Sequence, residues 1–196
     1  MTRRTALPAC LAALLWAGAA QAQAPLPATA TEPAARMADA WPEPKDALAQ
    51  GKLIGQARLT VWGFDIYDAR LWAPAAFSAG NFAASALALE LRYLRNFQAL
   101  DIAERSIKEM RRSQPVSDAQ AAQWKADMLR VIPDVRKGDR ITGVHRPGQG
   151  AAFWVNGQAS GEVRDADFAR LFFGIWLSPD TSEPRMRAAL LAGAGE

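Results

Sequence analysis

Two residues that a predicted hairpin brings together, Arg58 and Tyr67, could hold an anion. A two-residue turn at Trp62-Gly63 would place Arg58 directly opposite Tyr67. Their side chains would then project from the same face, with Cβ atoms about 5 Å apart. A guanidinium beside a phenol suits a carboxylate or a phenolate, because it offers a charge-assisted fork and one further donor. The alternative is a surface arginine stacked on a tyrosine.

The residue types that metal, thiol and phosphate sites need are sparse in this chain. His145 is the only histidine and Cys10 the only cysteine, so one chain cannot build a site from two imidazoles or two thiolates. The glycines of Gly148-Gln149-Gly150 precede a predicted strand, whereas a phosphate-binding loop precedes a helix, and we interpret them as a turn. No metal site is therefore expected.

The first 22 residues predict a cleavable export signal. Arg3 and Arg4 precede an apolar run over 6–20, and a small-x-small sequence ends at Ala22. The run is short for a membrane-spanning helix. We expect cleavage after Ala22, no stable membrane insertion afterwards, and a periplasmic or secreted protein.

Composition predicts one globular domain after a flexible lead-in. Residues 23–46 are rich in Ala, Pro and Thr, and the domain is expected over 47–196. Half of the chain is hydrophobic and 22% is charged, as in ordinary globular proteins. The 23 Lys and Arg lose two with the signal, leaving 21 against 20 Asp and Glu. A nucleic-acid partner is not expected, because phosphate binding needs a concentrated cationic face.

The pattern of predicted elements indicates an α+β fold. Strands are predicted over 53–61, 64–72, 86–94, 140–146, 151–155 and 158–163, and helices around 101–110 and 117–132, after Asp165 and after Ser182. Asn156-Gly157 predicts a tight hairpin. Strands and helices that occur in blocks favour a largely antiparallel sheet covered by helices.

Five segments along the chain carry a family resemblance. They are Gly55–Phe64, Tyr67–Trp72, Ala86–Tyr93, Gly138–Arg140 and Phe172–Leu177. In order and spacing they resemble the bacterial exported branch of the chalcone isomerase-like proteins, over about 51–191. The resemblance implies an open-faced β-sandwich, in which a large antiparallel sheet packs against helices with a ligand cleft between them.

The catalytic members of that family use a set of polar side chains that this chain mostly lacks. Plant chalcone isomerases use an Arg and a Thr from the first hairpin, a Tyr and an Asn seven residues apart, and a later Thr. The strand Arg corresponds to Arg58 or lies one position away, and the strand Thr falls near Tyr67. The Tyr and the Asn fall on Ile102 and Glu109, and the later Thr falls near Leu171. We therefore expect a non-catalytic protein, since little remains to stabilise a developing enolate.

The non-catalytic branch of the family binds fatty acids, with an Arg and a Tyr at the carboxylate and an apolar cleft around the tail. The resemblance thus implies a monomer without a cofactor that binds a fatty acid or a similar apolar anion through Arg58 and Tyr67, with Thr60 nearby. Candidate wall residues, each of which could also be plain core, are Leu91, Ile107, Met110, Phe168, Phe172 and Trp176.

Two alternatives stay open. An isomerase or intramolecular lyase could act on an unsaturated carbonyl compound, with Tyr67 as acid or base and Arg58 holding an oxyanion. A haem-binding protein could use His145 as an axial ligand, although its place beside Pro147-Gly148 favours an exposed turn.

Overall fold

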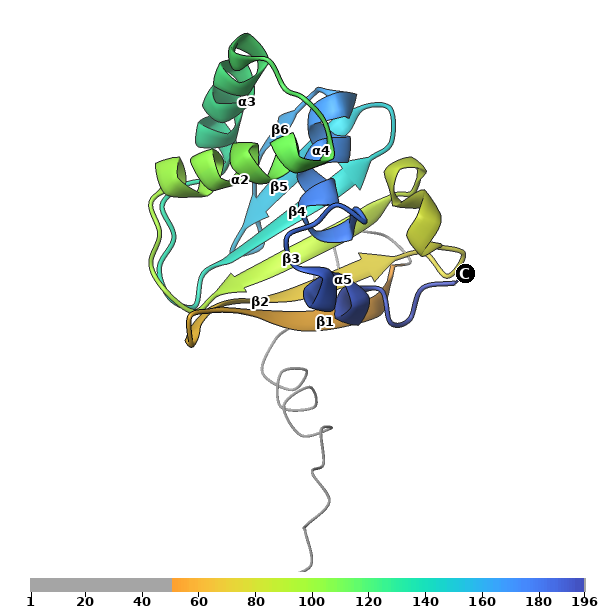
Figure 1. Ribbon diagram of the computed structural model, residues 1–196. Coiled ribbons are helices and arrows are strands. Elements are labelled where there is room, and N and C mark those ends of the chain that lie inside the picture. The colour runs from red at the N-terminus through yellow and green to blue at the C-terminus, as the bar shows by residue number, and fades with distance from the viewer. Residues whose placement is uncertain (1–50, 196) are drawn as a thin grey trace, which may run out of the picture.

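The computed structural model describes residues 51–195, which form a six-stranded sheet and its helices (Figure 1). The predicted export signal, lead-in and domain start lie outside these residues. The strands are antiparallel and follow chain order across the sheet. They are β1 (Lys52–Val61), β2 (Phe64–Ala73), β3 (Leu87–Tyr93), β4 (Arg140–Arg146), β5 (Gly150–Val155) and β6 (Gln158–Val163). The predicted α+β fold with an antiparallel sheet is confirmed.

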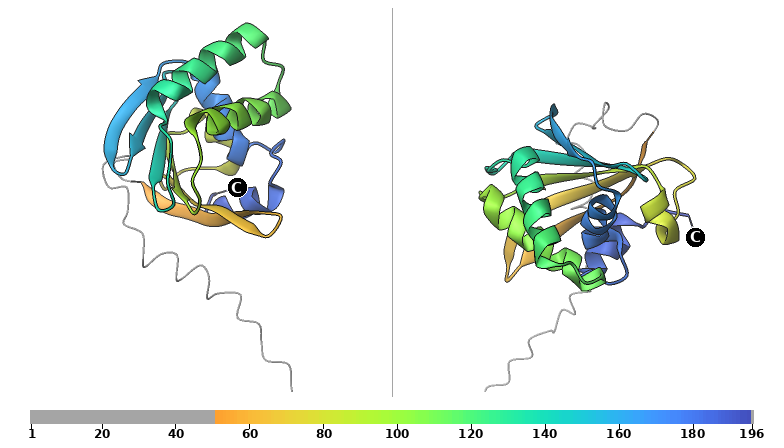
Figure 2. Two further views of the ribbon diagram at one scale, coloured as in Figure 1. Left: turned by 90° about the vertical axis from the view of Figure 1, so that its left-hand side faces the viewer. Right: turned by 90° about the horizontal axis from the view of Figure 1, so that it is seen from above.

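The longer helices lie together on one side of the sheet, which leaves the architecture open-faced (Figure 2). The helices are the short 3-10 helix η1 (Ala79–Ala84), α2 (Ala99–Ser113), α3 (Asp118–Val131), α4 (Ala166–Leu177) and α5 (Pro184–Leu190). Helix α4 packs on β4 and β5, α3 packs on β6, and α5 packs on β1. Among the described residues, no helix combines the length and apolarity needed to cross a membrane.

Side chains cap two of the helices that the sequence predicts. The Ser117 hydroxyl accepts a hydrogen bond from the Gln120 backbone N–H at 3.2 Å, at the start of α3. The Asp165 carboxylate accepts one from the Phe168 N–H at 2.9 Å, at the start of α4. Its second oxygen accepts a bond from Trp124 Nε1 at 2.8 Å. Asp165 therefore fixes the start of α4 and ties it to α3.

The core lies between the sheet and these helices. Alternate residues of the central strands point into it, including Leu71 of β2, Leu89 of β3 and Phe153 of β5, each no more than 3% exposed. Phe168 and Phe173 of α4 are fully buried against them. This apolar layer supplies most of the hydrophobic stabilisation, and it fixes which face of each strand looks toward the helices.

A bulge interrupts the pairing of β1 and β2 close to their turn. The turn is the predicted Trp62-Gly63 pair. Beyond it, Thr60 pairs with Asp65, but the next residue of β1, Leu59, pairs with Tyr67. Ile66 is therefore an extra residue on β2, opposite no residue of its own.

The bulge removes the expected pairing of Arg58 with Tyr67. Arg58 pairs instead with Asp68, whereas Tyr67 points toward the helices. The prediction was wrong because a one-residue shift in register moves a side chain to the other face of a sheet. Arg58 and Tyr67 lie on opposite faces.

Candidate functional site

A cavity of about 350 Å³ lies between the sheet and helices α2, α4 and α5. Its volume is within the range of small-molecule sites. The wall is mainly apolar. The sheet contributes Leu59, Val61, Ile66, Leu91 and Ile141, and the helices contribute Ile102, Phe172, Ile175 and Met186. A mostly apolar wall excludes water and favours an apolar ligand.

Several predicted wall residues are in the cavity and others are not. Tyr67, Leu91, Phe172 and Trp176 line it. The other three, Ile107, Met110 and Phe168, are buried in the core and do not line the cavity. On α2 the cavity side is formed by residues 101, 102, 105, 106 and 109, so 107 and 110 lie on a different stripe of the helix. Phe168 packs on Trp124 of α3, with ring centroids 5.9 Å apart.

The Tyr67 hydroxyl is the central polar group of the cavity on the sheet side. Trp176 Nε1 donates a hydrogen bond to its oxygen at 3.0 Å. Burial raises the pKa of Tyr67 well above its ordinary value, and the charges of Glu183 and Glu109 raise it further. The phenol therefore stays protonated at neutral pH. Because its oxygen accepts from the indole, its own proton is available to an oxygen atom of a ligand.

Four charged residues also line the cavity. On α2, Arg105 forms an ion pair with Glu109 Oε1 at 2.8 Å, and Asp101 lies one turn before Arg105. Glu183 enters from the segment that leads into α5. Glu109 is only 8% exposed, and its Oε2 atom has no hydrogen-bond partner. The cavity thus combines an apolar wall with a buried carboxylate and a phenol.

Sequence analysis missed three of these charged residues. It gave no role to Asp101, Arg105 or Glu183. Positions 101, 105 and 109 repeat at four-residue spacing beside Ile102, and that stripe is the signal that could have pointed to them. The family resemblance did place Ile102 and Glu109 at functional positions, and both line the cavity.

Arg58 belongs to an ion cluster on the opposite face of the sheet. Its Nε donates to Asp68 Oδ1 at 2.6 Å and its Nη1 donates to Asp65 Oδ2 at 2.9 Å. Arg92 also bonds Asp68, at 2.9 Å, and the Thr60 hydroxyl donates to Asp65 at 2.7 Å. The hydrogen bonds that Arg58 donates to Asp68 raise the pKa of Arg58 above its ordinary value. Arg58 and Thr60 do not line the cavity, which corrects their predicted place beside a ligand there.

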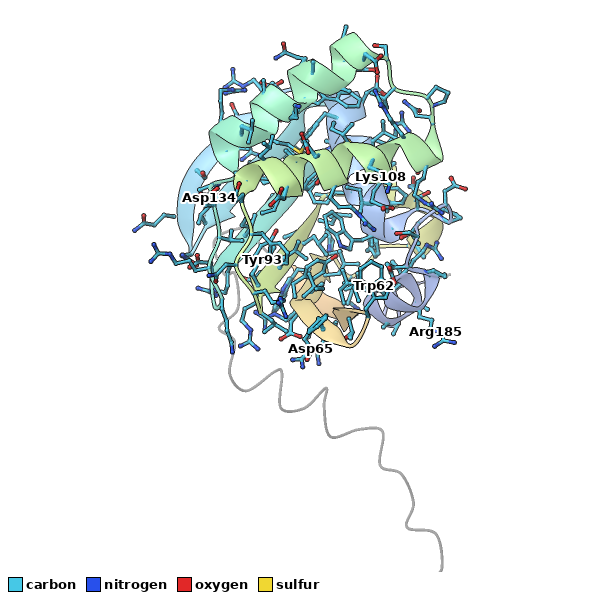
Figure 3. All side chains as sticks on the ribbon, turned by 60° about the vertical axis from the view of Figure 1, so that its left-hand side comes forward. Trp62, Asp65, Tyr93, Lys108, Asp134 and Arg185 are labelled. Carbon is cyan, nitrogen blue, oxygen red and sulfur yellow. The ribbon has the colours of Figure 1, made fainter. Side chains whose placement is uncertain are left out.

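The two faces separate clearly around the β1–β2 hairpin (Figure 3). Tyr93 lies beneath α2, between the strands and the helices, and it lines the cavity. Asp65 lies at the hairpin on the side away from α2, where it pairs with Arg58. Residues of neighbouring strands therefore face different surroundings.

His145 is a core residue. It lies in β4, it is 2% exposed, and its Nδ1 is 2.9 Å from the Ser85 carbonyl oxygen. The Phe173 ring packs edge-on against it at 5.2 Å. Burial lowers the pKa of His145. The predicted exposed turn was wrong because β4 continues through position 146, and His145 does not line the cavity.

Comparison with solved structures finds the same fold in a plant protein. The Arabidopsis thaliana fatty-acid binding protein AtFAP1 matches with a TM-score of 0.58 at 10% identity. The match covers 74% of this chain and 88% of AtFAP1. The likeness shows a shared fold.

Comparison of sequences finds one curated relative and a family. An uncharacterized protein of Haemophilus influenzae is 27% identical over 139 residues, which are 70% of this chain. The chain spans about two thirds of that relative, 66% of its length. The family model for chalcone isomerase-like proteins matches residues 49–192, nearly all of the described fold. The chain therefore belongs to the chalcone isomerase-like family.

Proposed function

We propose that this protein is an exported, non-catalytic binding protein for a fatty acid or a similar apolar carboxylate, held in the cavity between the sheet and the helices. The single observation that carries the proposal is the cavity itself, an apolar space of about 350 Å³ with the Tyr67 hydroxyl in its wall. The fold shared with a fatty-acid binding protein supports it.

Physical magnitudes favour a ligand with a long apolar part. Burial of a methylene group contributes about 0.8 kcal/mol, so a dodecyl chain gives roughly 9 kcal/mol before entropy losses. A hydrogen bond from Tyr67 contributes only about 0.5–1.5 kcal/mol net. The tail would supply most of the affinity, and the polar end would set the orientation of the ligand in the cavity.

The export part of the proposal rests on the predicted signal of the first 22 residues. Expression of the full chain in a bacterium with an outer membrane tests it. The mature protein is expected in the periplasmic fraction. Its mass should be that of a chain whose first residue is Gln23. An uncleaved chain in the cytoplasm would contradict export and would leave the binding proposal standing.

A blocked-cavity variant tests ligand binding. Delipidated protein is expected to bind dodecanoic acid with a 1:1 endpoint in calorimetry. Ile102 lines the cavity from α2, so Ile102→Trp should fill it and weaken binding at least tenfold. Leu100→Trp is the matched control, because Leu100 lies on the same helix, is 43% exposed and does not line the cavity.

The control separates a blocked cavity from a damaged helix. Leu100→Trp should bind as the wild type does, and both variants should keep the wild-type circular dichroism spectrum. Absence of binding to wild-type protein across acids of eight to eighteen carbons would contradict the proposed function. Equal binding by the wild type and Ile102→Trp would contradict this cavity as the site.

A further inference from the structure

We propose that the cavity takes its fatty acid in the neutral, protonated form, with the acid O–H donated to Glu109 and the acid carbonyl accepting from Tyr67. The inference rests on the proposed function and names the form of the ligand that the site selects. A site for a carboxylate anion would instead present free cations.

The first observation is the state of Glu109. Its side chain is 8% exposed, it lines the cavity, and one of its two oxygens is engaged by Arg105 at 2.8 Å. The other oxygen, Oε2, is buried without a hydrogen bond and forms a longer ion pair with Arg112 Nε, at 3.7 Å. A buried carboxylate oxygen without a donor is costly. A ligand that donates to Oε2 as the carboxylate turns toward the cavity would remove that cost.

The second observation is the balance of charge around the cavity. Its lining holds three acids, Asp101, Glu109 and Glu183, and one cation, Arg105. That cation is already paired with Glu109. A carboxylate anion would therefore meet excess negative charge, and the buried Glu109 would repel it most, because water screens a buried charge least. A neutral head group avoids this repulsion.

The third observation is the complementarity of the two polar walls. Tyr67 offers an O–H, since its oxygen already accepts from Trp176 Nε1 at 3.0 Å. Glu109 offers an acceptor on the opposite wall, on α2. A protonated carboxyl group carries one acceptor and one donor, so it can satisfy both walls at once. A carboxylate anion offers acceptors alone.

The proton balance of this binding step gives a measurable signature. A free carboxylic acid has an ordinary pKa of about 4 to 5 and is an anion at pH 7.5. Binding in the neutral form must take one proton from the buffer for each ligand bound. The affinity then falls about tenfold for each unit of rising pH. The charged or titratable groups near the head group are Asp101, Arg105, Arg112, Glu183, Tyr67 and Tyr93.

Calorimetry in two buffers with different ionisation enthalpies measures this proton uptake. At pH 7.5, dodecanoic acid is expected to bind with uptake close to one proton per ligand. Dodecanol is the ligand control, because it presents a neutral donor and acceptor without titrating. It should bind with no proton uptake and with no change in affinity between pH 6.5 and 8.5.

A substitution tests the part played by Glu109. In Glu109→Gln the side-chain amide can donate to a carboxylate and the negative charge is gone, so the variant should accept the anion. Proton uptake should fall toward zero and the pH dependence of affinity should disappear. Glu104→Gln is the matched control, because Glu104 is on the same helix, 58% exposed, and not in the cavity.

The outcomes separate this inference from the proposed function. Binding of dodecanoic acid to wild-type protein without proton uptake would overturn the neutral form and would leave the binding function intact. Undiminished proton uptake in Glu109→Gln would overturn the role of Glu109. Failure of the wild type to bind either ligand would overturn both proposals. Urea unfolding of each variant identifies any loss of stability.

Discussion

The two faces of the sheet carry different chemistry, although each strand serves both. Toward the helices, β2 and β3 present Tyr67, Leu91 and Tyr93 to an apolar cavity. On the other face, Asp68 pairs with two arginines and Glu90 pairs with Arg70 at 2.8 Å. A candidate binding residue must therefore be assigned to one face of the sheet before it is assigned a role.

The charged face depends on the pairing of its buried carboxylates. Asp68 is fully buried, so its carboxylate is tolerable only because guanidinium groups bond it. The cavity face shows the reverse, since Glu109 Oε2 is buried with no hydrogen bond. A buried carboxylate whose two oxygens are both bonded, as in Asp68, indicates a structural role, whereas an unsatisfied carboxylate oxygen beside a cavity indicates space for a ligand.

The largest effect is expected from breaking the charged face at its centre. Asp68→Ala would leave Arg58 and Arg92 without their shared carboxylate. We expect the free energy of unfolding to fall by about 3–5 kcal/mol, as when one partner of a buried ion pair is removed. Urea denaturation measures this change. Asp65→Ala removes the exposed acid from the same cluster and should lower the free energy of unfolding far less. An equal fall in the free energy of unfolding for both variants would contradict the contrast between the two acids.

The next effect concerns the cavity face and the hydroxyl of Tyr67. Tyr67→Phe removes the hydrogen-bond donor and keeps the ring, so affinity for dodecanoic acid should fall between about twofold and tenfold. Calorimetry measures the change. Thr60→Val removes a hydroxyl from the opposite face of the same hairpin and should leave affinity unchanged. If both variants lose affinity equally, the separation of the faces does not govern binding.

A smaller effect on the helix-covered side should appear as a dependence of stability on pH. Burial lowers the pKa of His145 from the ordinary 6.5, so the unfolded chain binds a proton that the native protein resists. Stability should therefore fall as pH drops below 6.5, by at most about 1.4 kcal/mol per pH unit. Urea unfolding at pH 7.5, 6.5 and 5.5 measures the slope, and His145→Gln should abolish it. A slope that persists in the variant would mean that another group is responsible, although His145 is the only histidine of the chain.

The smallest effect on binding is expected from Arg58. Because its guanidinium bonds Asp65 and Asp68 away from the cavity, Arg58→Ala should change affinity for dodecanoic acid less than twofold. Its side chain is 39% exposed and Arg92 still pairs with Asp68, so the stability loss should be about 1 kcal/mol. A tenfold loss of affinity would restore Arg58 as a ligand-binding residue.

The sequence predicted the elements whose signals are local. The Trp62-Gly63 turn, the helix starts at Ser117 and Asp165 and the order of strands and helices all depend on neighbours in the chain. The α+β fold follows from that order. These features could be predicted because their physical causes lie within a few residues.

The candidate site was less predictable because its geometry depends on distant contacts. Nothing in the sequence marks Ile66 as an extra residue, since isoleucine is common in regular strands. Likewise, Arg105 and Glu109 have the spacing of an ordinary surface ion pair, and only the docking of α2 over the sheet places them at a cavity. One unseen bulge was enough to assign Arg58 to the wrong side.

The extra residue in β2 links the two faces of the sheet. Around it, Asp65 and Asp68 point outward while Ile66 and Tyr67, adjacent in the chain, both line the cavity. The same bulge places two consecutive residues in the apolar wall of the cavity. On the opposite face of the sheet it places two acids around the guanidinium of Arg58. A mutation that straightened the strand would therefore change the shape of the cavity and the stability of the hairpin together.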